Sequence, residues 1–128
     1  MSAMSDYLEN EILDHILGTG SYTMPSAVYI GLSTGSFGDD NSGTELNGSG
    51  YARVAATFNA AASGTADNAS AIQFAAATGS WGSVSHFGIF DASTGGNLLI
   101  HGAFTTAKTI ASGDILKIDA GDLDISAD

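Results

Sequence analysis

Residues 83–106 read SVSHFGIFDASTGGNLLIHGAFTT, and this stretch decides the fold. Two runs containing apolar and aromatic residues, Ser83 to Asp91 and Asn97 to Thr106, flank the sequence ASTGG at 92–96. A short glycine-containing segment between two such runs is typical of a β-hairpin. The stretch therefore predicts two long antiparallel strands joined by a tight loop.

Both faces of this hairpin carry apolar side chains. Phe87 and Ile89 share one face of an alternating strand, whereas Val84 and Phe90 share the other. If both faces are covered, we expect the hairpin to lie in the centre of a sandwich or to face a partner. Across the hairpin, His86 and His101 could face each other, as a two-histidine metal or proton site or simply as a polar pair.

The chain on both sides of the hairpin repeats a period of two residues, with glycine-rich turns between the runs. Further strands are expected at 27–33, 51–58, 70–74, 115–119 and 123–126. Six to eight short strands predict a mainly β fold, an antiparallel β-sandwich or barrel-like domain spanning residues 1–128 without a linker. The expected core consists of Ile30, Leu32, Val54, Phe58, Phe74, Phe87, Ile89, Leu98 and Ile100.

One amphipathic helix is expected at the N-terminus, from Ser5 to Leu17. Ser5 or Asp6 can cap its start, Asp6 with Glu9 resembles a capping box, and Gly18 ends it. Because a helix of about three turns is marginal alone, its apolar stripe must dock on the sheet of this chain or on a partner. That stripe consists of Leu8, Ile12, Leu13, Ile16 and Leu17.

Two polar segments interrupt the strands, at 34–50 and at 60–69. Loops of that length in a compact domain are usually functional or disordered. The first of these segments, a terminus, or both are expected to reach a neighbouring subunit. Deleting Gly38 to Leu46 should therefore leave the domain folded but weaken its retention on a larger particle. Arg53 follows this loop in the sequence. It is expected to order the loop, to pair with a carboxylate of a neighbouring subunit, or to form an ordinary intrachain salt bridge.

Charge and composition exclude several classes of protein. Three cations, Arg53, Lys108 and Lys117, stand against fourteen carboxylates, for a net charge of −11. Such a surface repels nucleic acid and anionic lipid, so neither is expected as a partner. The chain has no cysteine, and its first residues lack a secretion signal, so synthesis in a host cytoplasm is expected.

The sequence contains few patterns that are typical of catalysis or metal binding. No nucleophile elbow and no phosphate loop is present, so we expect no enzyme activity and no cofactor. Two acidic clusters are weak calcium candidates, one with Asp39 and Asp40 and the other with Asp122 and Asp124, near Asp119 and Asp128. Neither matches a calcium-binding loop, and acidic turns explain both clusters.

Several segments resemble a known family in the right order along nearly the whole chain. They are DYLENEILDH from Asp6, AVYIGLST from Ala27, GYAR ending at Arg53, Trp81-Gly82, SHFGIFDA at 85–92, GGNLL at 95–99 and GDLD at 121–124. The family comprises small virion proteins of tailed bacteriophages that are commonly labelled phage tail fibre protein. The resemblance implies a structural protein of the virion and brings no catalytic residues.

The label and the size of the chain point to different positions on the particle. A fibre shaft needs length or repeats, which this chain lacks, so a capsid decoration or cement protein is the first expectation. A small tail-fibre, tail-tip or baseplate subunit is the alternative, and a receptor- or carbohydrate-binding module is a third. The expected partners are the major capsid protein or other virion proteins, and further copies of the chain, with a trimer favoured. The candidate assembly contacts are Phe37, Leu46, Tyr51 and Arg53.

Overall fold

The computed structural model describes residues 2–127, and these form one helix and nine strands. The helix, α1, spans Asp6–Leu17. The strands are β1 (Ser2–Met4), β2 (Val28–Ser33), β3 (Val54–Ala56), β4 (Thr65–Asp67), β5 (Ile72–Gln73), β6 (Gly82–Phe90), β7 (Leu98–Ile110), β8 (Lys117–Ile118) and β9 (Asp124–Ser126).

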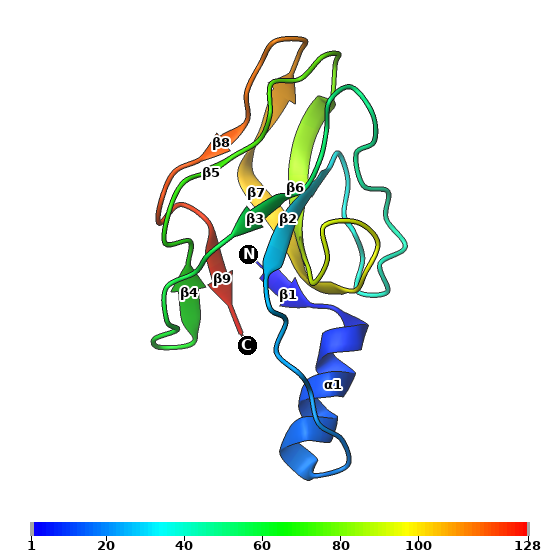
Figure 1. The fold of residues 1–128 in the computed structure, drawn as a ribbon, viewed down its shortest axis with the longest axis vertical. Helices are drawn as coiled ribbons and strands as arrows, with labels where there is room; N and C mark the ends of the chain where they lie inside the picture. The colour runs from blue at the N-terminus through cyan, green and yellow to red at the C-terminus, as the bar shows by residue number, and fades with distance from the viewer. Residues whose placement is uncertain (1, 128) are drawn as a thin grey trace.

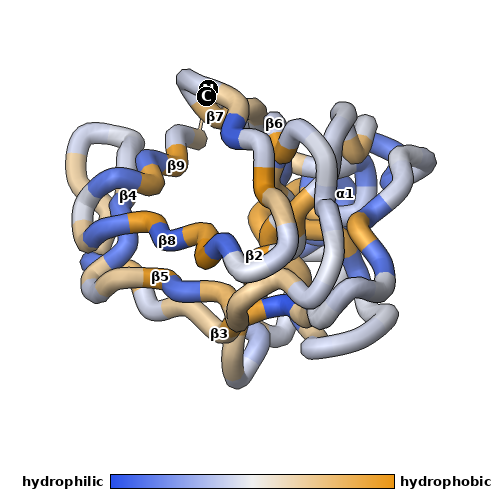
Figure 2. Tube along the Cα trace, turned by 90° about the horizontal axis from the view of Figure 1, so that it is seen from above, coloured by the Kyte–Doolittle hydropathy of each residue, from blue (hydrophilic) through white to orange (hydrophobic). Residues whose placement is uncertain are grey.

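All strand pairs are antiparallel, and they form one large and two small sheets (Figure 1). The large sheet has the order β1-β7-β6-β2-β3, while β4 pairs with β9 and β5 with β8. Viewed along the long axis, the two small sheets lie opposite the large one (Figure 2). The expected mainly β fold with an N-terminal helix is confirmed; of its two forms, the sandwich describes the arrangement better, because the sheets do not close into a barrel.

The main core lies between these layers. Its buried members come from the large sheet (Ile30, Leu32, Val84, Phe87, Ile89), from the small sheets (Ile72, Ile118, Ile125) and from connecting segments such as Phe74, Trp81 and Leu123. Six of the nine predicted core residues are buried, whereas Val54, Phe58 and Ile100 are half-buried at its margin. Trp81 closes one part of the core and donates its indole N–H to the carbonyl of Ser49, 2.9 Å away.

The predicted hairpin is present, and its two strands are the centre of the large sheet. Two irregularities interrupt the pairing of β6 with β7. Between the pairs Val84–Lys108 and His86–Ala103, one residue of β6 faces the four residues 104–107 of β7, which form a bulge in β7. Across this shift of register, between Val84 and His86, β6 does not keep its simple alternation: Val84 joins Phe87 in the main core although alternation puts them on opposite faces.

Two strands form where the sequence shows no strand pattern. β1 precedes the helix and pairs with residues 100–102 of β7. β4 lies inside the polar 60–69 segment and pairs with β9, with Ala66 opposite Ile125. Neither has an alternating apolar pattern, so distant pairing partners, not local sequence, determine them.

Ser5 begins the helix and also fastens it to the sheet. Its hydroxyl accepts a hydrogen bond from the N–H of Leu8, 3.2 Å away, and donates one to the carbonyl of Leu98 in β7. Ser5, not Asp6, is therefore the N-cap, so Asp6 and Glu9 do not stand at the positions that the expected capping box requires. Gly18 ends the helix in the left-handed conformation, as predicted, with φ of 79°.

Replacing Ser5 with alanine should lower the free energy of unfolding by about 1–2 kcal/mol. The change removes the cap and leaves the Leu98 carbonyl without this donor in a buried position. Denaturant titration measures the loss, with the exposed Ser21→Ala as a control that should change stability little. Equal stability of the two variants would show that the cap does not anchor the helix.

Candidate functional site

The outer face of the large sheet carries a cluster built on two glycines. Gly31 of β2 lies opposite Gly88 of β6, and neither puts a side chain on this face. A Cβ atom on either glycine would lie 2.9 Å from the ring of Phe90, so the bare backbone makes room for that ring. Phe90 packs edge-on against Phe37 at 5.6 Å and joins Leu98 in a second, smaller core.

Arg53 covers the other side of the Phe90 ring. Its guanidinium carbon lies 3.6 Å from the ring centroid, a cation–π contact. Two parallel hydrogen bonds join Arg53 to the Glu45 carboxylate, from Nη2 to Oε1 at 2.7 Å and from Nε to Oε2 at 2.9 Å. Because the Arg53 side chain is only 8% exposed, this pair is largely withdrawn from solvent screening.

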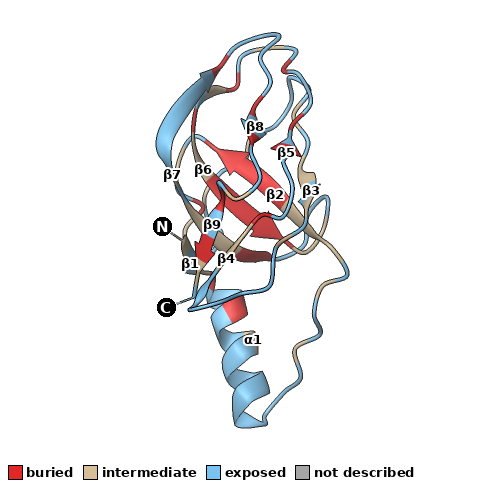
Figure 3. Cartoon of the chain, turned by 90° about the vertical axis from the view of Figure 1, so that its left-hand side faces the viewer, coloured by how far each residue is buried: buried red, intermediate tan, exposed pale blue. Residues whose placement is uncertain are grey.

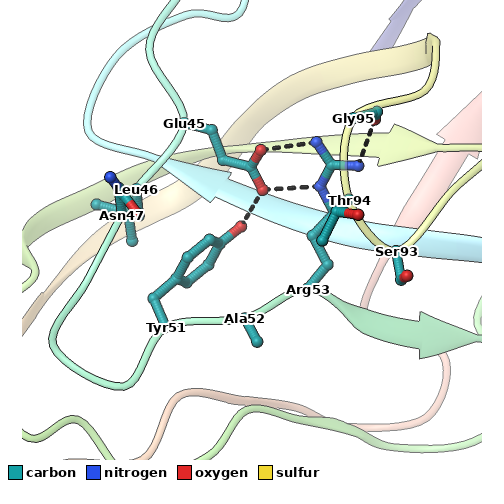
Figure 4. A pocket seen from close by; sticks show the side chains of 9 residues that line it. All are labelled: Glu45, Leu46, Asn47, Tyr51, Ala52, Arg53, Ser93, Thr94 and Gly95. Carbon is teal, nitrogen blue, oxygen red and sulfur yellow. Dashed lines mark hydrogen bonds and ion pairs between the residues drawn. The ribbon is translucent and has the colours of Figure 1, made fainter.

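The same guanidinium also holds the hairpin loop. Its Nη1 donates to the carbonyls of Ala92 and Gly95, each 2.8 Å away. Figure 4 shows Arg53 between Glu45 on one side and this loop on the other, beside a cavity of about 240 Å³ that Asn47, Ser93 and Thr94 help to line. Arg53 thus ties together the 34–50 loop, β6 and the hairpin loop, and four of its five N–H donors are used inside the chain.

Tyr51 completes the cluster. Its hydroxyl donates a hydrogen bond to the Glu45 carboxylate and accepts one from the N–H of Leu32, 2.9 Å away. Leu32 lies in the part of β2 that extends beyond the pairing of β2 with β3. Burial raises the pKa of the Tyr51 phenol well above its usual value, and the hydrogen bond to Glu45 raises that pKa further. Tyr51 therefore stays protonated and acts as a fixed donor to Glu45.

The four candidate assembly contacts all have roles inside the chain. Phe37 is 1% exposed, Leu46 and Tyr51 pack against the main core, and Arg53 binds Glu45. Of the alternatives for Arg53, the contact that orders the loop is the one observed, as a buried intrachain ion pair. These contacts argue against the expectation that deleting Gly38 to Leu46 spares the domain, because the deletion removes Glu45 and the hydrogen bond from Leu46 N–H to the Leu32 carbonyl.

The two hairpin histidines do not form a joint site. The register puts Ala103 opposite His86 and Gly88 opposite His101, so the histidines are offset by two positions. His101 lies 2.7 Å from an Asp39 carboxylate oxygen and thereby fastens the 34–50 loop to β7. His86 is within 2.7 Å of the hydroxyl of its neighbour Ser85.

Three of the four acidic calcium candidates lie in turns, and the fourth lies in a strand. Asp39 contacts His101, and the Asp40 carboxylate accepts the N–H of Ser42; hydrogen bonds from Ser42 lower the pKa of Asp40. Asp122 stands in a turn after Asp119, and Asp124 lies in β9, while Asp128 is outside the described residues. Within residues 2–127, no three His, Asp or Glu side chains converge as a metal site would require.

Calcium should therefore leave the melting temperature unchanged, compared with excess chelator and with a matched magnesium control. A ligand that binds the native state raises stability in proportion to the logarithm of its concentration above Kd, so a real site would be visible at millimolar calcium. A rise of many degrees with calcium alone would contradict the prediction.

The helix leaves most of its apolar stripe in solvent. Of its twelve residues only Leu8 is buried, by packing near the first turn (Figure 3). Leu13, Ile16 and Leu17 are 55%, 73% and 70% exposed. The stripe therefore does not dock on the sheet of this chain, which was one of the two expected outcomes. Several exposed apolar side chains that share one surface of a small protein indicate an interaction site.

An apolar groove continues this surface between the helix and the body. It encloses about 630 Å³, and its lining includes Ile12, Met24, Phe58, Leu99 and Ile100. Met24, in the segment after the helix, is 81% exposed. The helix stripe was predicted from the sequence, whereas the groove beside it was not.

A family model described as podophage GP4 fiber I protein gp80 matches residues 3–126. This chain belongs to that family. The match spans the helix and all strands from within β1 to β9, which confirms the resemblance to phage tail fibre proteins seen in the sequence. No curated protein matches the chain.

Membership in the family makes the chain a bacteriophage virion structural protein. The family is one of fibre proteins and is not described by any catalytic activity. In the described part of the chain, α1 is much shorter than the roughly 20 residues that a membrane-spanning helix needs.

Proposed function

We propose that this gp80 family protein is a subunit of a tail-associated fibre on a tailed bacteriophage. The observation that carries the proposal is the match to a podophage fibre protein over residues 3–126, which leaves almost no part of the chain outside the family. The subunit acts by binding neighbouring subunits, not by catalysis.

The structure supports a role in assembly through its exposed surface. A helix that buries one residue of its stripe gains little from its own chain, so a neighbour is needed to cover Leu13, Ile16 and Leu17. Capsid decoration would use the same surface, but the family description names a fibre, and it is therefore the less supported position.

Gold-labelled antibodies against the chain, applied to purified virions, test the position on the particle. We expect label at the tail or at the vertex that carries it, and a copy number far below that of the major capsid protein. Antibodies against the major capsid protein are the control, which should label the whole shell. Label of this chain spread evenly over the head would instead establish capsid decoration.

A further inference from the structure

The exposed helix of this chain is an apolar surface with a negative border. Ile12, Leu13, Ile16 and Leu17 form the apolar part. By helical spacing, Glu9 and Asp14 lie beside these residues, whereas Glu11 lies on the other side of the helix. The only basic side chain of the helix is His15 in its last turn. A surface that complements the helix must therefore be apolar and bordered by cations.

The chain itself offers few cations for this purpose. Of the three in the whole sequence, Arg53 is closed off by Glu45 and by two carbonyl groups. The remaining two, Lys108 and Lys117, are exposed and line the same small groove. Lys117 has only a long contact of 3.5 Å with Asp119, in which both side chains are more than half exposed, so its charge remains free to interact.

The groove between the two lysines is apolar. Its floor is formed by Val84, Phe104, Leu116 and Ile118, and it encloses about 60 Å³ beside the bulge of β7. Its size suits the insertion of one aliphatic side chain, with the lysines on either side. The surface formed by Lys108, Lys117 and this groove, which we call the lysine pole, thus has the properties that the helix requires.

The two surfaces lie at different ends of the molecule. Figure 1 places α1 at one end of the long axis, and β8 with the last residues of β7 toward the other end. One chain therefore cannot join its own helix to its own lysine pole. Two helices packed against each other would instead bring their carboxylates together, which disfavours a symmetric helix-to-helix contact.

We propose that the helix of one copy docks on the lysine pole of the next copy, so that subunits join head to tail. A contact between two different surfaces repeats without end unless rotation closes it into a ring. This inference rests on the proposed fibre role, since it explains how a compact chain without sequence repeats builds an elongated structure. The partner of the exposed helix is then a second copy of this chain.

Sedimentation velocity of the purified chain and of two variants tests the contact, at about 0.15 M salt so that general repulsion between acidic copies is screened. The helix variant carries Ile16→Ser and Leu17→Ser, and the pole variant carries Lys108→Ser and Lys117→Ser. The control, Ala60→Asp with Ala61→Asp, makes the same change in net charge as the pole variant in an exposed segment. Circular dichroism verifies that all variants are folded.

The parent and the control should form a series of oligomers that grows with concentration, and each variant should associate at least about tenfold more weakly. The decisive sample is the mixture of the two variants. Each has lost a different surface, so together they should form a one-to-one pair and nothing larger.

Three results would overturn the proposal: a monomeric parent at all concentrations, a pole variant that associates like the parent, or a mixture that does not pair. Because these measurements use no particle, they are independent of the antibody labelling. Tail labelling with a monomeric protein would reject only the head-to-tail contact, and head labelling with a self-associating protein would reject only the fibre role.

Discussion

Replacing Arg53 with methionine should lower the free energy of unfolding by about 2–4 kcal/mol. Methionine keeps much of the side-chain bulk over Phe90 but removes both hydrogen bonds to Glu45 and both to the hairpin loop. The Glu45 carboxylate is 23% exposed, so it would keep some contact with water, and the expected loss lies below that of a fully buried pair. Equilibrium denaturation at neutral pH measures the change.

The double variant Arg53→Met with Glu45→Gln separates the two causes of this loss. If the unpaired carboxylate dominates, the glutamine should restore a large part of the stability, because it removes the charge that Arg53 neutralised. If the lost ties to Ala92 and Gly95 dominate, the double variant should stay as unstable as the single one. A single variant as stable as the parent would contradict the role of Arg53 as the tie between the two loops.

Replacing Phe87 with alanine should cost about 3–5 kcal/mol, the largest effect that we expect from a single core change. Phe87 is 2% exposed in the central strand β6, and its ring lies 5.4 Å from that of Phe104. Its removal leaves a cavity between the large and small sheets, where strands on both sides limit the collapse of the surroundings. Because domains of this size are stable by only about 5–15 kcal/mol, the variant should melt many degrees below the parent.

Phe104→Ala is the matched control for this prediction. Phe104 is half-buried, packs against the edge of the core and lies in the bulge of β7, so its loss should cost clearly less than that of Phe87. Thermal melts of the two variants give the comparison directly. A shift of only a degree or two for Phe87→Ala would show that the centre of the core lies elsewhere.

Local sequence determined the elements whose hydrogen bonds and side-chain pattern are local. The helix has its cap at Ser5 and its stop at Gly18, and the hairpin has its glycine loop between two apolar runs. Alternation placed Ile30, Leu32 and Ile89 in the core, because a strand with one covered face must bury every second residue. The close approach of Phe90 to Gly31 and Gly88 was not predicted, although glycine inside a strand often marks a close approach of another group.

Tertiary structure decided the features that depend on residues far apart in the chain. β1 and β4 exist because β7 and β9 offer open edges, and their own residues carry no alternating pattern. The parity of Val84 changes where the register of β6 against β7 shifts, and a shift of register leaves no trace in the composition of a strand.

The 34–50 loop and the helix both show that the sequence does not reveal which surfaces are covered. A polar loop expected to reach outward instead folds back, because Phe37, Asp39 and Glu45 each find a partner on the outer face of the sheet. The apolar helix stripe expected to find cover remains exposed beyond Leu8. The sequence by itself determined which surfaces are apolar, because hydrophobicity belongs to each residue; only the tertiary structure decided which of them are covered, because cover depends on where distant segments meet.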